Sequence, residues 1–224
     1  MAVHEVELRD AWRHLSGGGH TDALERLLGR YREPHRRYHT AEHVMWVLRH
    51  VAEIAATGAA GDVPHDLAAV QLAALYHDAV YNPAATQPAA NEIASASLAG
   101  ACAAAFGWSD ERADRIERLV LATAHDTAHS DGTHAEQPDA DTAVLVDADL
   151  AILGAEPAAY AAYVNGVRHE YHHVPDHLWR QGRATVLQSL LDRRTIYATP
   201  HMRAGVEARA RANLAAELAT LSHS

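Results

Sequence analysis

The sequence predicts an all-α protein folded as a single helical bundle. Alanine, leucine, arginine and glutamate, which favour helices, dominate the chain throughout. No stretch alternates apolar and polar residues as a half-buried strand would. β-branched residues are sparse outside the segment from Val144 to Val146. These three observations favour helices along the whole chain.

Turn residues and capping residues divide this helical sequence into ten expected helices. Breaks rich in glycine, proline or polar residues fall at 17–19, 58–64, 82–88 and 126–140. Thr40 and Ser109 suit the capping positions of the helices that follow them, and Pro157 and Pro175 suit first turns. The expected helices are 5–15, 21–32, 40–57, 65–80, 89–106, 109–126, 141–153, 156–172, 176–193 and 201–220.

The composition narrows the class of protein. The chain has 224 residues and no break long enough for a linker, so we expect one domain over residues 1–224. A net charge of −10 argues against an extended nucleic acid as partner. No apolar run is long enough to span a membrane, and the first ten residues lack the apolar segment of a signal peptide. Cys102 is the sole cysteine, which excludes an intramolecular disulfide and a thiolate metal site. We therefore expect a cytoplasmic protein with no membrane partner.

The strongest local signal for chemistry lies between Leu72 and Val80. An apolar helical run ends there in the adjacent residues His77 and Asp78. Burying either polar side chain is costly unless it is bonded, and a charged aspartate costs more. A divalent cation would compensate both side chains. The alternatives are a hydrogen-bonded His-Asp pair or a pair exposed at the end of a helix.

Two further segments carry candidate ligands. His39 and His43 lie one helical turn apart, and an apolar stripe follows His43, so this residue lies on or beside the core-facing side. Asp147 and Asp149 interrupt an apolar segment at a spacing of two, so they cannot share one helix face. An inward carboxylate there needs a bonded partner. The alternatives are a core histidine bonded to a neighbour and an aspartate paired with an arginine.

Together these segments resemble the HD superfamily of metal-dependent phosphohydrolases. The family pattern is a histidine on one helix, a His-Asp pair on a later helix and a distant aspartate, which His43, His77–Asp78 and Asp149 match in order. Asp149 is preferred to Asp147 because the last family ligand typically reads Ala-Asp-Leu, as residues 148–150 do. The likeness to bacterial members covers nearly the whole chain and implies an HD-domain-like helical bundle. Further matching segments are 37–39, 79–81, 91–92, 95–96 and 153–154.

The segment from Tyr38 to His43 also resembles the Tyr-His-Asn-x-x-His signature of cyclic-nucleotide phosphodiesterases, a branch of that superfamily. This likeness implies that His39 donates a proton to the leaving oxygen and that His43 binds metal. Thr40 stands in place of the asparagine, and no His-Pro-Gly continuation follows the His-Asp pair. Both departures argue against cleavage of cyclic nucleotides.

The resemblance implies hydrolysis of a small phosphorylated substrate, a nucleotide-like phosphomonoester or phosphodiester, through metal-activated water. Nitrogen and oxygen ligands without thiolate suit Mn²⁺, Fe²⁺, Co²⁺, Ni²⁺ or Zn²⁺, with Mg²⁺ as a further candidate. One ion is expected. His125 and His129 lie four residues apart and are candidates to hold a second ion, the alternative being a surface histidine pair.

Candidate substrate-binding residues lie near these ligands in sequence. Arg36 and Arg37 precede His39, and guanidinium groups match phosphate oxygens. The alternative for this pair is a solvated positive surface. The other candidates are Tyr81, in the matched segment, and Arg168, which with Glu170 and Tyr171 lies on a later helix that could line the pocket.

Glu92 is the remaining catalytic candidate. It follows the His-Asp helix closely enough to serve as a base or to orient water. The alternative is an ordinary glutamate in the first turn of a helix.

Two other functions compete with hydrolysis. A di-iron oxygenase would use extra histidines, as related HD folds do, and a non-catalytic sensor would bind metal or nucleotide without turnover.

Overall fold

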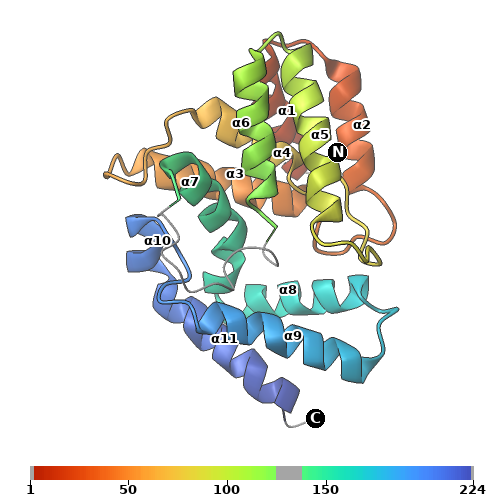
Figure 1. Cartoon of the computed structure of the whole chain (residues 1–224), viewed down its shortest axis with the longest axis vertical. Coiled ribbons are helices and arrows are strands. Elements are labelled where there is room, and N and C mark those ends of the chain that lie inside the picture. Colours follow the sequence, from red (N-terminus) through yellow and green to blue (C-terminus); the bar gives the residue numbers. More distant parts are fainter. Residues whose placement is uncertain (1–2, 125–137, 223–224) are drawn as a thin grey trace.

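The computed structural model describes residues 3–124 and 138–222, and within these ranges it contains helices and no strands (Figure 1). The all-α fold predicted from the sequence is confirmed. The elements are α1 (Val3–Ser16), α2 (Thr21–Tyr31), α3 (Ala41–Ala56), α4 (Leu67–Tyr76), α5 (Ala90–Ala105), α6 (Asp110–Leu121), α7 (Ala140–Asp149), the 3₁₀ helix η1 (Leu150–Gly154), α8 (Pro157–Glu170), α9 (Asp176–Leu191), α10 (Pro200–Gly205) and α11 (Glu207–Ser222).

Helix α4 lies at the centre of the bundle. Its residues from Ala69 to Tyr76 are buried on every side except at Gln71, which is the pattern of a helix enclosed by others. It contacts α1, α3, α5, α6 and α7. Because α3 and α7 also contact each other, the ends of three helices are brought close together. This arrangement positions the candidate site.

Helices α8, α9 and α11 form a second group beside this bundle, in blue and cyan at the bottom of Figure 1. A buried ion pair joins two of them, with Arg183 Nε 2.8 Å from Glu217 Oε1. Tyr163 of α8 accepts a hydrogen bond from Arg183, and Tyr160 of α8 donates one to Glu217. Since removing one partner of a buried ion pair is strongly destabilising, these contacts hold α8 in a defined position.

Short-range signals placed most helix starts correctly. The Thr40 hydroxyl accepts a hydrogen bond from Glu42 N, and the Ser109 hydroxyl accepts one from Arg112 N. Pro157 lies in the first turn of α8, as expected. Pro175 is instead the residue immediately before α9.

Four expected helices end early. The helix expected over 109–126 ends at Leu121, and the one expected over 141–153 ends at Asp149, where η1 begins. The other two end differently because of tertiary contacts. The helix expected over 65–80 ends at Tyr76, and residues 77–80 turn away. The helix expected over 201–220 is broken at Val206 into α10 and α11. Val206 lies so close to Gly154 that a β-carbon on that glycine would be 2.6 Å from Val206 Cβ. The close approach of η1 therefore requires glycine at position 154.

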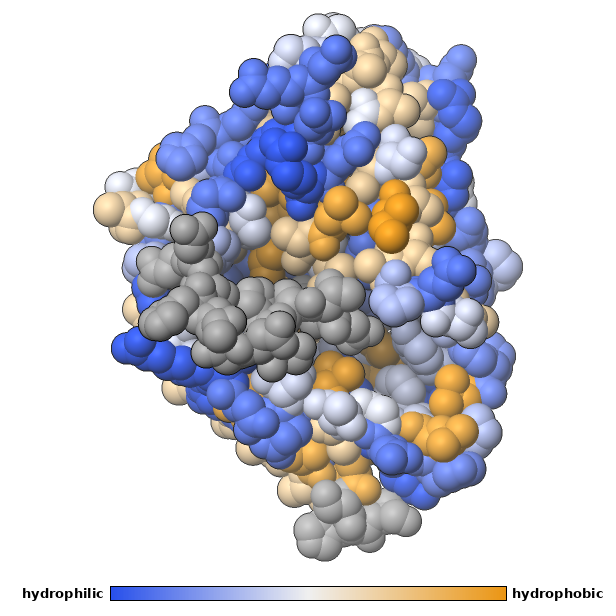
Figure 2. All heavy atoms as spheres, in the orientation of Figure 1, coloured by the Kyte–Doolittle hydropathy of each residue, from blue (hydrophilic) through white to orange (hydrophobic). Residues whose placement is uncertain are grey.

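On the face drawn in Figure 2, hydrophilic residues lie along most of the edges, and apolar residues gather in a patch in the upper half. Within residues 3–124 and 138–222, no helix is long and apolar enough to cross a membrane.

Candidate metal centre

The four residues named as metal ligands from the sequence lie together. His43 is in the first turn of α3, His77 and Asp78 follow the end of α4, and Asp149 is the last residue of α7. His43 Nε2 lies 3.1 Å from His77 Nε2, 3.3 Å from Asp78 Oδ2 and 3.2 Å from Asp149 Oδ1. His77 Nε2 is 3.1 Å from Asp78 Oδ2 and 3.5 Å from Asp149 Oδ1. The donor atoms of His43, His77 and Asp149 all lie within 4.8 Å of one another.

The chemistry of these atoms fits a cation. His77 Nδ1 lies 2.8 Å from the Ala74 carbonyl oxygen, so this nitrogen carries a proton and Nε2 is the ring nitrogen that could bind a cation. Such a backbone contact is the usual way in which a metal-binding histidine is oriented. Two imidazole nitrogens face each other at 3.1 Å with carboxylates beside them, and a divalent ion would satisfy all of them.

The pKa values of these groups reflect both their burial and the charges of their neighbours. Burial lowers the pKa of His77, but the charges of Asp78 and Asp149 outweigh it and hold this pKa well above its ordinary value. Burial likewise lowers the pKa of His43, and the same two carboxylates raise it on balance. For Asp78, burial raises the pKa, and His77, His39 and His43 lower it well below its ordinary value. The cluster therefore favours the binding of positive charge, either as protons or as a metal ion.

Beside this cluster, His39 forms a dyad with Glu170. His39 Nδ1 donates to Glu170 Oε2 at 2.6 Å, and the backbone N–H of His39 donates to Glu170 Oε1 at 3.0 Å. The same carboxylate accepts backbone N–H groups of Arg37 and Tyr38 at 2.6 and 2.7 Å. Burial raises the pKa of Glu170, but the His39 hydrogen bond and charge, with the backbone N–H groups, lower it to about 2. Glu170 is therefore an anion that fixes the ring of His39.

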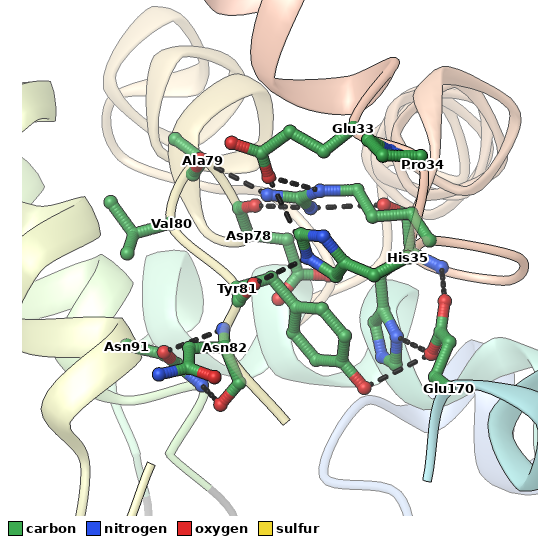
Figure 3. A network of polar contacts seen from close by, with 12 residues as sticks. Glu33, Pro34, His35, Asp78, Ala79, Val80, Tyr81, Asn82, Asn91 and Glu170 are labelled. Atoms are coloured by element: carbon green, nitrogen blue, oxygen red, sulfur yellow. Dashed lines mark hydrogen bonds and ion pairs between the residues drawn. The ribbon is translucent and has the colours of Figure 1, made fainter. Parts of the chain in front are cut away.

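Tyr81 completes the surroundings of the dyad. Its hydroxyl donates to Glu170 Oε2 at 3.0 Å, and its ring stacks on His39 with centroids 4.1 Å apart. His35, which lies between α2 and α3, contacts the backbone of Tyr81, with His35 Nε2 2.8 Å from the Tyr81 carbonyl oxygen (Figure 3). Because its hydroxyl is bonded to Glu170, Tyr81 holds the dyad in place, and its expected contact with substrate stays a prediction.

The chain matches no protein-family model, no curated protein and no solved structure.

Arg36, which the sequence suggested as a phosphate ligand, has a different role. Its side chain is buried, with Nη1 donating to the carbonyl oxygens of His39 at 2.9 Å and Asp78 at 2.8 Å. Nη2 donates to the Ala79 carbonyl oxygen at 3.2 Å, and Nε to Glu33 at 3.0 Å. The guanidinium therefore binds backbone carbonyls of the turn that follows α4. Its donors hold the turn and are not directed at a substrate.

Residues of α5 hold the same turn from its other side. Ser95 Oγ accepts the Val80 N–H at 2.9 Å. Asn91 Oδ1 accepts the Asn82 N–H at 3.0 Å (Figure 3). Asn91 Nδ2 also donates to the Asn82 carbonyl oxygen at 3.2 Å. The segments 91–92 and 95–96 thus include residues that shape the His-Asp turn.

The other two arginine candidates are also bonded to the chain itself. Arg37 is exposed, and its Nη1 donates to the carbonyl oxygens of Pro34 and Arg36. Arg168 donates to the carbonyl oxygens of Tyr171 and Val174 and to the carboxylate of Asp176. Arg168 therefore stabilises the connection between α8 and α9, and its place in a substrate pocket stays a prediction.

The two aspartates of α7 separate as the sequence pattern required. Asp149 faces the histidines, whereas Asp147 accepts the Ala198 N–H at 2.9 Å and the Thr199 N–H at 2.7 Å. Asp147 also accepts the Thr199 hydroxyl at 2.6 Å and is buried. It anchors the chain before α10 and is not available to the cluster.

The remaining candidates are placed as follows. Glu92 lies half-buried in the first turn of α5, and its role as a base stays a prediction. His125 and His129 lie outside the described residues. Glu170 was noted only as one of three residues on a late helix. Its spacing of 131 residues from His39 left no local signal of their pairing.

Proposed function

We propose that this protein is a metal-dependent phosphohydrolase of the HD superfamily that acts on nucleotide-like phosphate esters. The observation that carries the proposal is the convergence of two imidazoles and two carboxylates from three helices on one buried point, beside a histidine oriented by a carboxylate. This combination provides a cation site and a proton donor side by side.

His43, His77, Asp78 and Asp149 would hold the ion. A divalent ion held there supplies Lewis-acid chemistry, since it activates a water molecule for attack and polarises a phosphoryl oxygen. Nitrogen and oxygen ligands suit several divalent ions, so Mn²⁺, Fe²⁺, Co²⁺, Ni²⁺, Zn²⁺ and Mg²⁺ are the ions to test.

His39 would protonate the leaving oxygen. Because its Nδ1 proton is donated to Glu170, the remaining ring nitrogen, Nε2, is the atom that can pass a proton to the departing alkoxide. The Glu170 carboxylate stabilises the positively charged ring that carries this proton, and Tyr81 keeps that carboxylate in position. Arg36 and Ser95 fix the backbone on which Asp78 lies.

The test combines metal analysis of the purified protein with turnover of nucleotides and aryl phosphates. We expect Asp78→Asn to lose bound metal and turnover together. We expect His39→Ala to retain metal while turnover falls by about 10²–10⁴-fold, the usual value of a general acid. The exposed residue His14 on α1 provides the control variant His14→Ala, for which neither quantity should change.

Unchanged turnover in a correctly folded Asp78→Asn protein would refute the proposed chemistry. Bound metal without turnover of any phosphate ester would support a sensor instead. Bound iron with oxygen consumption would support the oxygenase.

A further inference from the structure

A cavity outside the metal centre lies between helix α3, the 3₁₀ helix η1 and helix α10, and residues at the starts of α8 and α11 complete its wall. It encloses about 340 Å³, a volume within the range of small-molecule sites. None of the candidate metal ligands is among the described residues that line it, and neither His39 nor Glu170 is. His50 of the lining follows His43 by seven residues, about 10 Å along the helix axis. The cavity is therefore a second candidate site, carried by elements that also hold metal ligands.

Most of the cavity wall is apolar. Met202 of α10, Ala151 of η1 and Ala155 are buried residues of this wall. Trp46 of α3 adds a large aromatic ring, which lies 4.6 Å from the ring of His50, measured between centroids. His50 Nδ1 donates to the Trp46 carbonyl oxygen at 2.9 Å, so the imidazole is fixed beside the indole. The wall therefore offers a ligand apolar surface and an aromatic ring in a defined position.

The charged residues of the lining leave one carboxylate without a permanent counter-charge. Glu156 is paired with Arg209 at 2.8 Å, and Arg209 Nε also donates to the Gly154 carbonyl oxygen. Glu53 lies 3.4 Å from His201 Nε2, and an imidazole offsets a carboxylate only while it is protonated. Above the ordinary titration range of histidine, the cavity therefore carries the negative charge of Glu53.

An organic cation fits this wall better than a metal ion or an anion. Within residues 3–124 and 138–222, the one group of three or more metal-ligating atoms that converge within 4.8 Å is formed by His43, His77 and Asp149. The carboxylates and imidazoles of the cavity are thus too far apart for a bare ion. An anion would meet the carboxylate of Glu53, while the guanidinium of Arg209 is already bonded. A small ammonium ion matches both parts of the wall, because its alkyl groups pack on apolar residues and its charge is attracted to a carboxylate and to an indole ring.

We propose that this cavity binds a small organic cation of the alkylammonium class, with its alkyl groups against Trp46 and Met202 and its charge beside Glu53. The proposal goes beyond the phosphohydrolase function and does not depend on it, because the cavity and the metal centre share no described residue. Its tests therefore measure binding and not turnover.

The first experiment titrates the protein at pH 8 with choline and with 3,3-dimethylbutan-1-ol, using calorimetry. The two compounds have nearly the same shape, and only choline carries a positive charge. We expect choline to bind at least about 5-fold more tightly, the scale of one cation–π contact. Absence of choline binding, or equal affinity for the neutral alcohol, would overturn the proposal.

The second experiment uses Glu53→Gln, which removes the charge at the place assigned to the cation. The Glu53 side chain is 60% exposed, so glutamine fits there without repacking the fold. We expect the affinity for choline to fall about 5-fold. Glu42→Gln is the matched control, because Glu42 is an exposed residue of the same helix that does not line the cavity, and its choline affinity should stay within about twofold of the parent value. Equal choline affinities of the two variants would show that the net charge of the chain attracts choline and that this site does not.

Two further variants locate the bound cation. Trp46→Leu keeps an apolar side chain and removes the indole, so the affinity for choline should again fall about 5-fold. Asp78→Asn changes a candidate metal ligand that does not line the cavity, so its affinity for choline should equal that of the parent protein. Loss of choline binding in Asp78→Asn, with binding retained in Glu53→Gln, would place the cation at the metal centre and overturn the proposal.

Discussion

Replacing Glu170 by glutamine separates the charge of this carboxylate from its shape. Glu170 is 1% exposed and accepts five hydrogen bonds, three at Oε1 from backbone N–H groups and two at Oε2 from His39 and Tyr81. The glutamine amide can keep its oxygen toward the three backbone donors. Its NH₂ group then faces His39 Nδ1, and a donor cannot accept the proton that the carboxylate accepted. The variant therefore removes the counter-charge of the proton donor and leaves most of the packing.

The expected loss of stability can be worked from the pKa of Glu170. Folding lowers this pKa from its ordinary value of 4.5 to about 2. At about 1.4 kcal/mol for each tenfold change, the ionised carboxylate contributes about 3 kcal/mol to the free energy of unfolding near neutral pH. Because the folded pKa is depressed, this contribution is fully present above pH 4.5 and is lost as the pH falls toward 2.

Denaturant unfolding at pH 7 and at pH 3 measures this contribution directly. We expect Glu170→Gln to be less stable than the parent protein by about 3 kcal/mol at pH 7, with a smaller difference at pH 3. Turnover should fall about 10²-fold while bound metal is retained. The exposed residue Glu111 on α6 provides the matched control Glu111→Gln, for which stability should change by less than about 0.5 kcal/mol. Equal stability of Glu170→Gln and the parent at both pH values, with undiminished turnover, would refute the dyad.

Five further variants each test one local feature of the structure. Asp149→Ala should lose bound metal, whereas Asp147→Ala should retain it. Asp147→Ala should lose about 2 kcal/mol of stability, because buried donors near Thr199 lose their acceptor. Metal analysis and thermal melts of the two variants measure these effects. Arg37→Ala should change KM by less than about threefold, since its guanidinium donates to carbonyl oxygens of its own segment. A KM raised tenfold or more would instead support Arg37 as a phosphate ligand. Gly182→Ala on α9 should gain about 1 kcal/mol of stability, because no atom lies within 4 Å of the new β-carbon. Gly166→Ala on α8 should gain less and slow turnover, because its β-carbon would lie 3.1 Å from Tyr38 Cβ.

The helical architecture could be predicted from the sequence because its causes are local. Helix propensity, capping by Thr40 and Ser109, and the apolar run of α4 act between residues a few positions apart. The order His43, His77–Asp78 and Asp149 is also visible in the sequence, and a spacing of two residues was enough to show that Asp147 and Asp149 point to different surroundings. These features depend on helix geometry, which every position shares.

The tertiary structure alone decided which polar groups are satisfied by one another. Arg36 bears the same charge as any surface arginine, yet it is buried because it can reach the carbonyls of Asp78 and Ala79, more than forty positions away. Glu170 meets His39 across 131 residues, and no periodic pattern records such a pairing. The residue type fixes which hydrogen bonds and charges a side chain can offer. Whether those groups are already bonded within the protein depends on the direction in which distant helices present their donors and acceptors. That direction is set by packing of the whole core, since only the folded chain removes these groups from water and requires each to find a partner.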